Sequence, residues 1–482
     1  MTHQLLAGLG RRITNARPGS PKFGIRLFSD PIQGYESDLT ATALVLTNGA
    51  EKLALIALDI CELFNPFSTE IRQAVADQLT IPLSHVMLSL SHDHSTPMTP
   101  GPTRDDPERE RLAKIYGNEL KQWILEAVQE AAGNLQPVRV GAGVGQAQVG
   151  IYRRETGPDG HDVLGEDPNR SIDHSVGVVR VDDLEGRSIA ILFSYGCHPV
   201  SMGPRNHLGS SDFPGAAREI IEKTLNTKAM FLQGCGGNVN PKWGIGYEVD
   251  CRDAKNRLGA ILAGEVLKVS AGIHTHVGLG ARVHLGNIPN ILFNRWNPVD
   301  DTGNAPLAAA EEIVKLGFIE LPSLEKAQAW YQHWSNLRQE KEKNGAQDWE
   351  IRMASMYETA YQRTVEAVKQ GNPTIDLDVQ VFRIDDIILT GLSVEAFTET
   401  GLKIKLASPF PNTIPLSYTN SAVAYLPREE DYPKGGYQLG EVYHVPDLFI
   451  QSYLLPTALQ PDAEQIAVNK VVELIQRLAI VQ

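Results

Sequence analysis

The sequence predicts an α/β fold in which a single catalytic unit occupies residues 1–482. Apolar runs of strand length alternate with amphipathic stretches of helical length along most of the chain. Turn signals such as Asn48-Gly49 lie between neighbouring runs and indicate hairpins. No Pro- or Ser-rich linker divides the chain, so separate domains are not expected.

The expected strands are short runs rich in Leu, Val, Ile and Ala, bounded by glycine or polar residues. They are Ala41–Thr47, Leu53–Asp59, His85–His92, Val176–Val181, Ile189–Tyr195, Ala229–Gln233 and Ile375–Phe382. The last of these alternates apolar and polar residues, which is typical of a half-exposed strand.

The expected helices carry apolar residues three and four positions apart, and their ends have the usual signals. Gly133-Asn134 stops the longest of them, and Pro214 begins another. The helices are Phe67–Gln78, Pro107–Ala132, Pro214–Leu225, Cys251–Ser270 and Pro461–Leu478. Residues 289–371 are expected to form a mainly helical insertion, because Pro322–Gln370 has the pattern of two long polar helices.

The composition excludes several classes of protein. With 42% apolar and 21% charged residues, the chain has enough apolar surface to fold. Acidic residues outnumber basic ones by 58 to 44, for a net charge of −14. This disfavours nucleic acids and anionic membranes, which attract Lys and Arg. No apolar run approaches the roughly 18 residues of a membrane span, so we expect a small-molecule substrate and no membrane anchor.

The N-terminus and the cysteines indicate a cytoplasmic protein. Residues 1–12 lack the basic-then-apolar order of a secretory signal. No C-x-x-C spacing occurs among the four cysteines, which argues against a disulfide framework and a cysteine-only zinc site. They are Cys61, Cys197, Cys235 and Cys251.

Histidines stand at the ends of two expected strands. One strand runs into His92-Asp93-His94, and residues two apart in extended chain point to the same side. Both imidazoles could reach one ion or substrate, although two solvated loop histidines would give the same pattern. His198 follows the strand Ile189–Tyr195, where a core histidine bonded to the backbone is the alternative. Because ligand clefts in α/β proteins form at strand ends, the repetition favours a functional site.

A third strand, Ala229–Gln233, runs into the glycine-rich turn Gly234-Cys235-Gly236-Gly237. Glycines let backbone N–H groups converge on an anion or an oxyanion, but a tight strand-to-helix turn has the same composition. The spacing matches neither a Walker A loop nor the dinucleotide fingerprint. Cys235 could be a nucleophile, but no basic residue lies near it in sequence, which favours buried packing.

Other motifs carry less information. His274-Thr275-His276 follows a helix rather than a strand and is expected at the surface. Neither a G-x-S-x-G elbow nor H-E-x-x-H occurs, and the metallo-β-lactamase pattern H-x-H-x-D-H is absent.

Taken in order, these segments resemble the catalytic domain of the neutral ceramidases, zinc-dependent amidases that cut the N-acyl bond of ceramide. The family motifs T-H-T-H-S, H-P-T-S-M and S-S-D resemble Ser91–Ser95, His198–Met202 and Ser210–Asp212. The motifs Q-S-N-x-G-D-V-S-P-N, P-G-E-F-T and H-Y-I-T-T-x-E-E-Y resemble Gln233–Lys242, Ser393–Thr398 and Ala424–Tyr432. The resemblance spans Gly8 to about Tyr437 and implies a mixed-sheet, ceramidase-like α/β domain. The family's C-terminal immunoglobulin-like module is not expected, because the chain ends on a helical pattern.

Residue by residue, the resemblance implies that His92, His198, Glu395 and Tyr425 hold Zn²⁺ and that His94 faces the substrate carbonyl. Two imidazoles and a carboxylate are the protein ligands of many catalytic zinc sites, which leave one position for water. Zinc brings the pKa of that water towards neutrality, and an adjacent dication would favour the tyrosine phenolate.

One departure from the family concerns the substrate. The family's active-site serine falls on Gly234, and an aspartate of the same motif falls on Asn238. The backbone N–H groups of Gly234 and Cys235 remain candidates for contacting the scissile amide. These two differences from the family leave the implied zinc ligands in place. They remove the reason to expect ceramide as the substrate.

We therefore expect a zinc-dependent hydrolase in which zinc-activated water attacks an amide or related bond of a soluble substrate. His94 would stabilise the oxyanion or shuttle protons. A zinc hydrolase of an ester or a glycoside, and a non-catalytic binder that kept the pocket, are the alternatives. An amidohydrolase barrel would need eight regular βα repeats, which we do not find.

Overall fold

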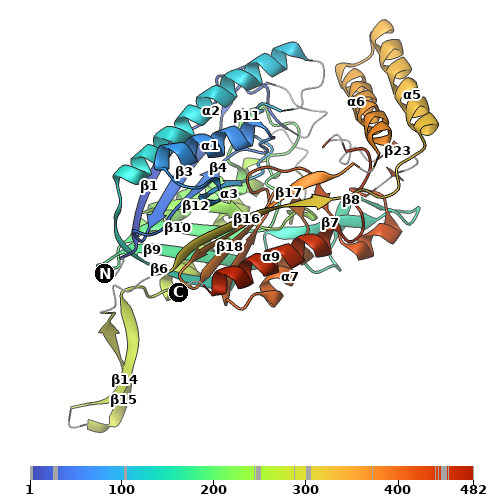
Figure 1. The fold of residues 1–482 in the computed structure, drawn as a ribbon. Helices are drawn as coiled ribbons and strands as arrows, with labels where there is room; N and C mark the ends of the chain where they lie inside the picture. Colours follow the sequence, from blue (N-terminus) through green and yellow to red (C-terminus); the bar gives the residue numbers. More distant parts are fainter. Residues whose placement is uncertain are drawn as a thin grey trace.

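The computed structural model describes residues 4–24, 31–101, 106–243, 245, 251–286, 288–299, 305–371, 373–439, 441–442, 445–446, 453 and 455–480. Two β-sheets lie face to face at the centre, and helices cover the outer face of each (Figure 1). The predicted mixed α/β fold is confirmed, as four layers of helix, sheet, sheet and helix.

The larger sheet has eight strands, antiparallel at its centre and with a parallel pair at each edge. In spatial order the strands are β12 (Lys228–Gln233), β10 (Ser188–Tyr195), β9 (Ser175–Asp183), β6 (Gln136–Gln146), β1 (Leu6–Ile13), β3 (Thr40–Thr47), β4 (Lys52–Leu58) and β5 (Val86–Leu90). The predicted hairpin joins β3 to β4. Asn48 shapes its turn, because Oδ1 accepts hydrogen bonds from the N–H groups of Ala50 and Glu51, at 3.1 and 2.9 Å.

The smaller central sheet has four strands, of which β18 and β20 are parallel. In order they are β16 (Leu307–Leu316), β17 (Ile375–Ile384), β18 (Ile387–Leu392) and β20 (Asn412–Leu416). The remaining strands form separate small sheets of two or three strands: β2 (Gly34–Tyr35) with β11 (Leu208–Gly209), β13 (Val239–Pro241) with β7 (Gly150–Thr156) and β8 (Asp162–Asp167), β14 (Val277–Leu285) with β15 (Ile288–Pro298), β19 (Glu395–Ala396) with β21 (Tyr425–Leu426), and β22 (Glu441–Val442) with β23 (Val445–Pro446).

Helices cover both outer faces of the paired sheets. Those over the larger sheet are α1 (Phe67–Leu79), α2 (Pro107–Gly133), α3 (Asp212–Leu225) and α4 (Arg252–Gly272). Those over the smaller sheet are α7 (Thr398–Ala407) and α9 (Ala463–Ala479). The helices α5 (Leu324–Lys343) and α6 (Asp348–Gln370) form a separate hairpin, and η2 (Leu83–His85) and η3 (Glu429–Lys434) are short 3₁₀ helices.

Alternation along the strands divides the core into layers. On β3, Leu44 and Leu46 belong to the cluster between the two sheets, which includes Phe382 of β17. Ala43 and Val45 point the other way, into the cluster under α1 and α2. A side-chain period of two places successive residues on opposite faces, so each of these strands has apolar residues on both faces.

Three parallel strand pairs determine where a site can form. They are β4 with β5, β10 with β12, and β18 with β20. In an α/β fold the carboxyl ends of parallel strands are where ligand-binding side chains gather. His92, His198 and Glu395 come after the ends of β5, β10 and β18, whereas Tyr425 lies on the short strand β21.

The segment expected to be mainly helical also contains strands. The helices α5 and α6 lie where two long helices were predicted, but β15 and β16 also fall within residues 289–371, and residues 300–304 lie outside the described residues. The sequence of β16, Leu-Ala-Ala-Ala-Glu-Glu-Ile-Val-Lys-Leu, has high helix propensity. It forms a strand because it pairs with β17 from Leu307 to Leu316, so tertiary contacts override the local preference.

Two further features concern the part of the chain that the structure describes. None of its helices is long and apolar enough to cross a lipid bilayer. Its last element is α9, and no immunoglobulin-like module occurs among the described residues.

Replacing Gly10 with alanine is expected to destabilise the protein by about 3 kcal/mol, because overpacking strains a close contact. Gly10 lies on β1 against α2, and a Cβ there would lie 2.1 Å from the carbonyl oxygen of Ala127. Denaturant unfolding would measure the loss. Gly264→Ala is the matched control, because nothing lies within 4 Å of that Cβ on α4. Helix propensity predicts that the control gains up to about 1 kcal/mol. Equal stabilities for the two variants would contradict this packing.

Candidate active site

Two of the predicted histidines lie at strand ends in the interior. His92 follows β5 and His198 follows β10, and each is 1% exposed. His92 has a φ of 59°, in the left-handed region that non-glycine residues avoid. Such strained positions concentrate at functional sites, where surrounding contacts hold them. Here the backbone N–H of His92 donates to the carbonyl of Ile60, at 3.0 Å.

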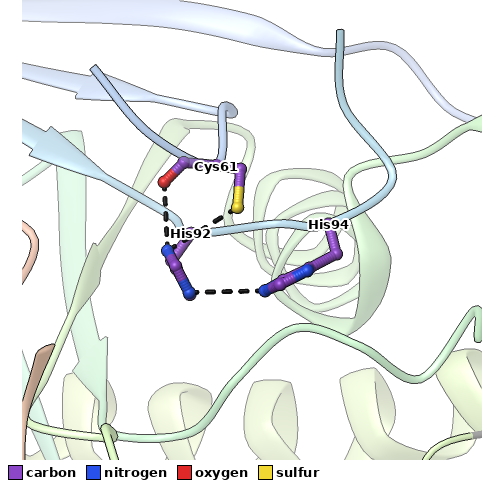
Figure 2. Close-up of side chains that lie close together, drawn as sticks. All are labelled: Cys61, His92 and His94. Atoms are coloured by element: carbon purple, nitrogen blue, oxygen red, sulfur yellow. Dashed lines mark hydrogen bonds between the residues drawn. The ribbon is translucent and has the colours of Figure 1, made fainter. Parts of the chain in front are cut away.

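Backbone carbonyls define the tautomers of His92, His94 and His198. In each ring Nδ1 contacts a carbonyl oxygen, which can only accept, so Nδ1 carries the proton. The acceptors are the carbonyls of Cys61 at 3.1 Å, Gly24 at 3.0 Å and Gly236 at 2.8 Å, respectively. The Nε2 atoms are therefore left with their lone pairs. Figure 2 shows those of His92 and His94 facing each other, 3.3 Å apart.

Glu395 brings a carboxylate to the same point. It lies on β19, after β18, and is 2% exposed. Its Oε2 is 3.5 Å from Nε2 of His92 and 3.0 Å from Nε2 of His198. The second distance is short, but its geometry is not that of a hydrogen bond, and Nε2 of His198 has no hydrogen-bond partner among the described residues. Ligand atoms of His92, His198 and Glu395 all lie within 4.8 Å of one another.

This arrangement fits a cation. The Nε2 lone pairs of His92 and His198 and the carboxylate oxygen of Glu395 meet where little water can screen their repulsion. Burial lowers the pKa of His92 and of His198, so protonation of these rings does not relieve that repulsion. A divalent metal on the Nε2 side would relieve it. Two neutral imidazoles, each oriented through Nδ1, and a carboxylate are a typical zinc ligand set.

The structure also places Tyr425 beside Glu395. The short strands β19 and β21 are parallel, with Glu395 paired to Tyr425 in register. Burial, and then the Glu395 carboxylate, raise the pKa of the Tyr425 phenol well above its usual value. The buried guanidinium of Arg153 acts in the opposite direction and donates a hydrogen bond to the Tyr425 hydroxyl, at 3.3 Å. Phenolate formation at this position therefore needs a stronger cation than Arg153 alone.

Two tyrosines that the sequence analysis did not identify hold Glu395. Tyr418 donates to Oε2 of Glu395 at 3.0 Å, and its ring stacks on His92 with a centroid distance of 4.1 Å. Tyr453 donates to Oε1 of Glu395 and contacts Oε1 of Glu62 at 3.0 Å. Tyr418 comes just after the end of β20, so the strand-end rule that identified His92 could have identified it too. For Tyr453 the sequence gives no such signal.

The motif Ser210-Ser211-Asp212 supports the loop that carries His198. Asp212 is fully buried, and its Oδ2 accepts a hydrogen bond from the N–H of Met202 at 3.0 Å. Its Oδ1 accepts from the hydroxyl of Ser201. Two motifs that are separate in sequence therefore form one support, which ties the loop after His198 to the start of α3.

Cys61 belongs to a second group of metal-binding atoms, with His92 and His94 (Figure 2). Its Sγ lies 3.7 Å from Nδ1 of His92. That nitrogen already donates to the carbonyl of Cys61, so binding a metal there would break this hydrogen bond. A metal on the Nε2 side of His92 would leave this hydrogen bond intact.

Gly234 and Cys235 have other roles in the described structure. The N–H of Gly234 donates to the carbonyl of Tyr195 at 3.0 Å, so it is occupied by a sheet contact. The side chain of Cys235 belongs to the core cluster under α9, and burial raises the pKa of its thiol to about 12. These contacts do not support an oxyanion role for Gly234 or a nucleophilic role for Cys235. In the second His-x-His motif, His274-Thr275-His276, the ring of His274 packs on the ring of Trp296, with 4.8 Å between the ring centroids.

Comparisons with known proteins agree with the predicted resemblance. No family model matches the sequence. Neutral ceramidase A of Dictyostelium discoideum is 28% identical over 146 residues, covering 27% of this chain and 20% of that protein. Neutral ceramidase B of the same organism is 23% identical over 265 residues, covering 48% and 35%. The matches thus span well under half the length of these curated relatives.

The fold comparison covers nearly the whole chain. The crystal structure of neutral ceramidase from Pseudomonas aeruginosa matches 98% of this chain and 75% of its own, with a TM-score of 0.65 and 17% identity. A ceramidase complexed with C2 matches 99% and 76%, with a TM-score of 0.65 and 16% identity. The chain therefore has the neutral ceramidase fold, and the resemblance predicted from its motifs is confirmed.

Proposed function

We propose that this chain, with its neutral ceramidase fold, is a zinc-dependent hydrolase that cleaves an amide bond. His92, His198, Glu395 and Tyr425 would hold the zinc. The observation that carries the proposal is the meeting of the Nε2 atoms of His92 and His198 with Oε2 of Glu395 in one buried place. When bound there, zinc supplies Lewis acidity, which lowers the pKa of water to about 7 and polarises a carbonyl group.

The residues around the ligands keep them in position. The carbonyls of Cys61 and Gly236 hold the rings of His92 and His198 with Nε2 inward. Tyr418 and Tyr453 each donate to one oxygen of the Glu395 carboxylate. Contacts of this kind orient metal ligands before the metal arrives, and losing one typically costs about 10- to 100-fold in metal affinity or activity.

His94 is suited to transfer a proton. It is less buried than His92 and His198, and its Nδ1–H donates to the carbonyl of Gly24 at 3.0 Å. Nε2 is then the atom that takes a proton from the attacking water or gives one to the leaving nitrogen. Proton transfer by a positioned side chain contributes about 10²- to 10⁴-fold to the rate.

The choice of substrate depends on position 234, where the family's serine is absent. A hydroxyl that bonds the amide can contribute about 1–3 kcal/mol once buried, which corresponds to about ten- to a hundredfold in rate. We therefore propose a smaller, more polar N-acyl substrate, bound through other contacts, in place of long-chain ceramide.

The zinc-loaded protein is expected to hydrolyse short, soluble N-acyl compounds at least about tenfold faster than a fluorescent long-chain ceramide, because it lacks that hydroxyl. The measurement is kcat/KM for both substrate classes, with an ester and a glycoside in the same panel. Efficient ceramide turnover would contradict the substrate assignment. If only the ester or the glycoside is hydrolysed, the protein cleaves that bond and not an amide. If the zinc-loaded protein hydrolyses none of the substrates, it is a non-catalytic binding protein.

The variant Gly234→Ser restores the missing hydroxyl, but the backbone around position 234 leaves little room for a side chain. A Cβ at this position would lie 2.9 Å from the backbone nitrogen of Gly196 and 3.1 Å from its Cα. Serine therefore requires a shift of the backbone, and its unfolding stability has to be measured beside its ceramide turnover. A stable variant with faster ceramide turnover would show that the missing hydroxyl limits ceramide cleavage.

A further inference from the structure

A two-stranded ribbon extends away from the two central sheets. It consists of β14 and β15, residues 277–298, and is called the arm here. In Figure 1 the arm points away from the helices and sheets of the body. Its strands pair with each other and with no further strand of the described residues, so both outer edges are open.

The arm exposes large apolar side chains on both of its faces. Those on described positions are between 41% and 63% exposed: Leu279, Ile288, Ile291, Leu292, Phe293 and Trp296. Along a strand, residues an even number of positions apart share a face. Ile291 and Phe293 therefore point to one side of β15, and Leu292 and Trp296 point to the other. Leu279, paired in register with Trp296, adds to the second face.

An isolated ribbon of this kind is marginally stable in water, because it buries too little apolar surface. Exposed apolar patches of more than a few hundred Å² mark interaction sites in folded proteins. The ring of His274 against Trp296 supports only the base of the arm. Something else must cover its length, and it must cover both faces.

The charges indicate what covers the arm. The arm carries Arg282 and Arg295, and no acidic residue occurs between Glu265 and Asp300. The whole chain has a net charge of −14, so the body outside the arm is more acidic still. A basic, apolar arm is complementary to this body, and opposite charges favour association. A bilayer is flat and would cover only one face of the arm.

We propose that the arm docks on a second copy of this chain and that the protein forms a two-fold symmetric dimer. In such a dimer each copy provides one arm and receives one, so every contact is made twice. Both faces of each arm are then covered by the body of the partner copy, which buries the apolar side chains of the arm. This inference does not depend on the hydrolase activity, because none of His92, His198 and Glu395 lies on the strands of the arm.

Light scattering coupled to size-exclusion chromatography, or sedimentation velocity, over a wide concentration range tests the proposal. The full chain is expected to be a dimer. A variant with Leu279→Ser, Phe293→Ser and Trp296→Ser is expected to weaken the dimer at least about 100-fold, since three apolar anchors are lost. Leu406→Ser is the matched control, because Leu406 on α7 is 90% exposed but lies outside the arm. It should remain dimeric.

A second variant tests the charges and does not disturb the apolar contacts. Arg282→Glu with Arg295→Glu is expected to weaken the dimer, and high salt is expected to weaken the unmodified dimer. Circular dichroism and zinc content identify any variant that is misfolded. Co-sedimentation with vesicles of phosphatidylcholine and phosphatidylserine tests the other occupant. A monomeric full chain, a dimer unaffected by the triple variant, or arm-dependent binding of a monomer to vesicles would each overturn the proposal.

Discussion

Replacing His92 or His198 with alanine is expected to remove bound zinc and to abolish hydrolysis. Each change deletes an Nε2 atom that meets Oε2 of Glu395, at 3.5 Å for His92 and 3.0 Å for His198. A catalytic zinc site has only three or four protein ligands, so the remaining set is too small to hold the ion firmly. Hydrolysis should fall at least about 10³-fold, because a catalytic metal contributes several kcal/mol to lowering the barrier.

Elemental analysis of the purified proteins checks this prediction. The unmodified chain should carry about one zinc, as one ligand set of this kind would hold. Zinc should also raise its stability, by about 4 kcal/mol at a free concentration 1000 times the dissociation constant. Neither variant should respond in this way. His85→Ala is the control, because His85 lies just before β5 and its Nε2 contacts Glu51 at 2.9 Å. Full zinc content in both variants would show that the ligand set is wrong.

Replacing His94 with alanine is expected to leave the zinc in place but to slow turnover by about 10²- to 10⁴-fold, as loss of a proton-transferring side chain does. Its Nε2 lies 3.3 Å from that of His92, but the group that also includes His198 and Glu395 does not include it. We therefore expect the zinc content of the His94→Ala variant to be unchanged and its kcat to fall.

Zinc content and steady-state kinetics on the same preparations distinguish the two histidines. A change in KM alone would assign His94 to substrate binding and not to proton transfer. Equal loss of zinc from His92→Ala and His94→Ala would make both residues ligands. A site with both as ligands would hold the metal through three imidazoles, and Tyr425 would then have a different role.

Several parts of the fold could be predicted from short-range pattern. The strands around Asn48-Gly49 and the helices flanking the central sheets follow local periodicity and turn chemistry, which act over a few residues. The histidines at positions 92 and 198 were identifiable because each directly follows an apolar run. The strand β16 could not be predicted from local pattern. Its Ala- and Glu-rich sequence favours a helix, and only the pairing with β17 makes it a strand.

The sequence by itself determined the alternation of strands and helices, the two histidine-bearing strand ends and the motif order that resembles the neutral ceramidases. Only the tertiary structure decided that Tyr418 and Tyr453 hold the Glu395 carboxylate and that the N–H of Gly234 is already bonded. Tyr453 is 58 residues from its partner Glu395 in sequence, so no local pattern records the contact. Local preferences follow from neighbouring residues, whereas a site assembled at the ends of strands from two sheets depends on how those sheets pack.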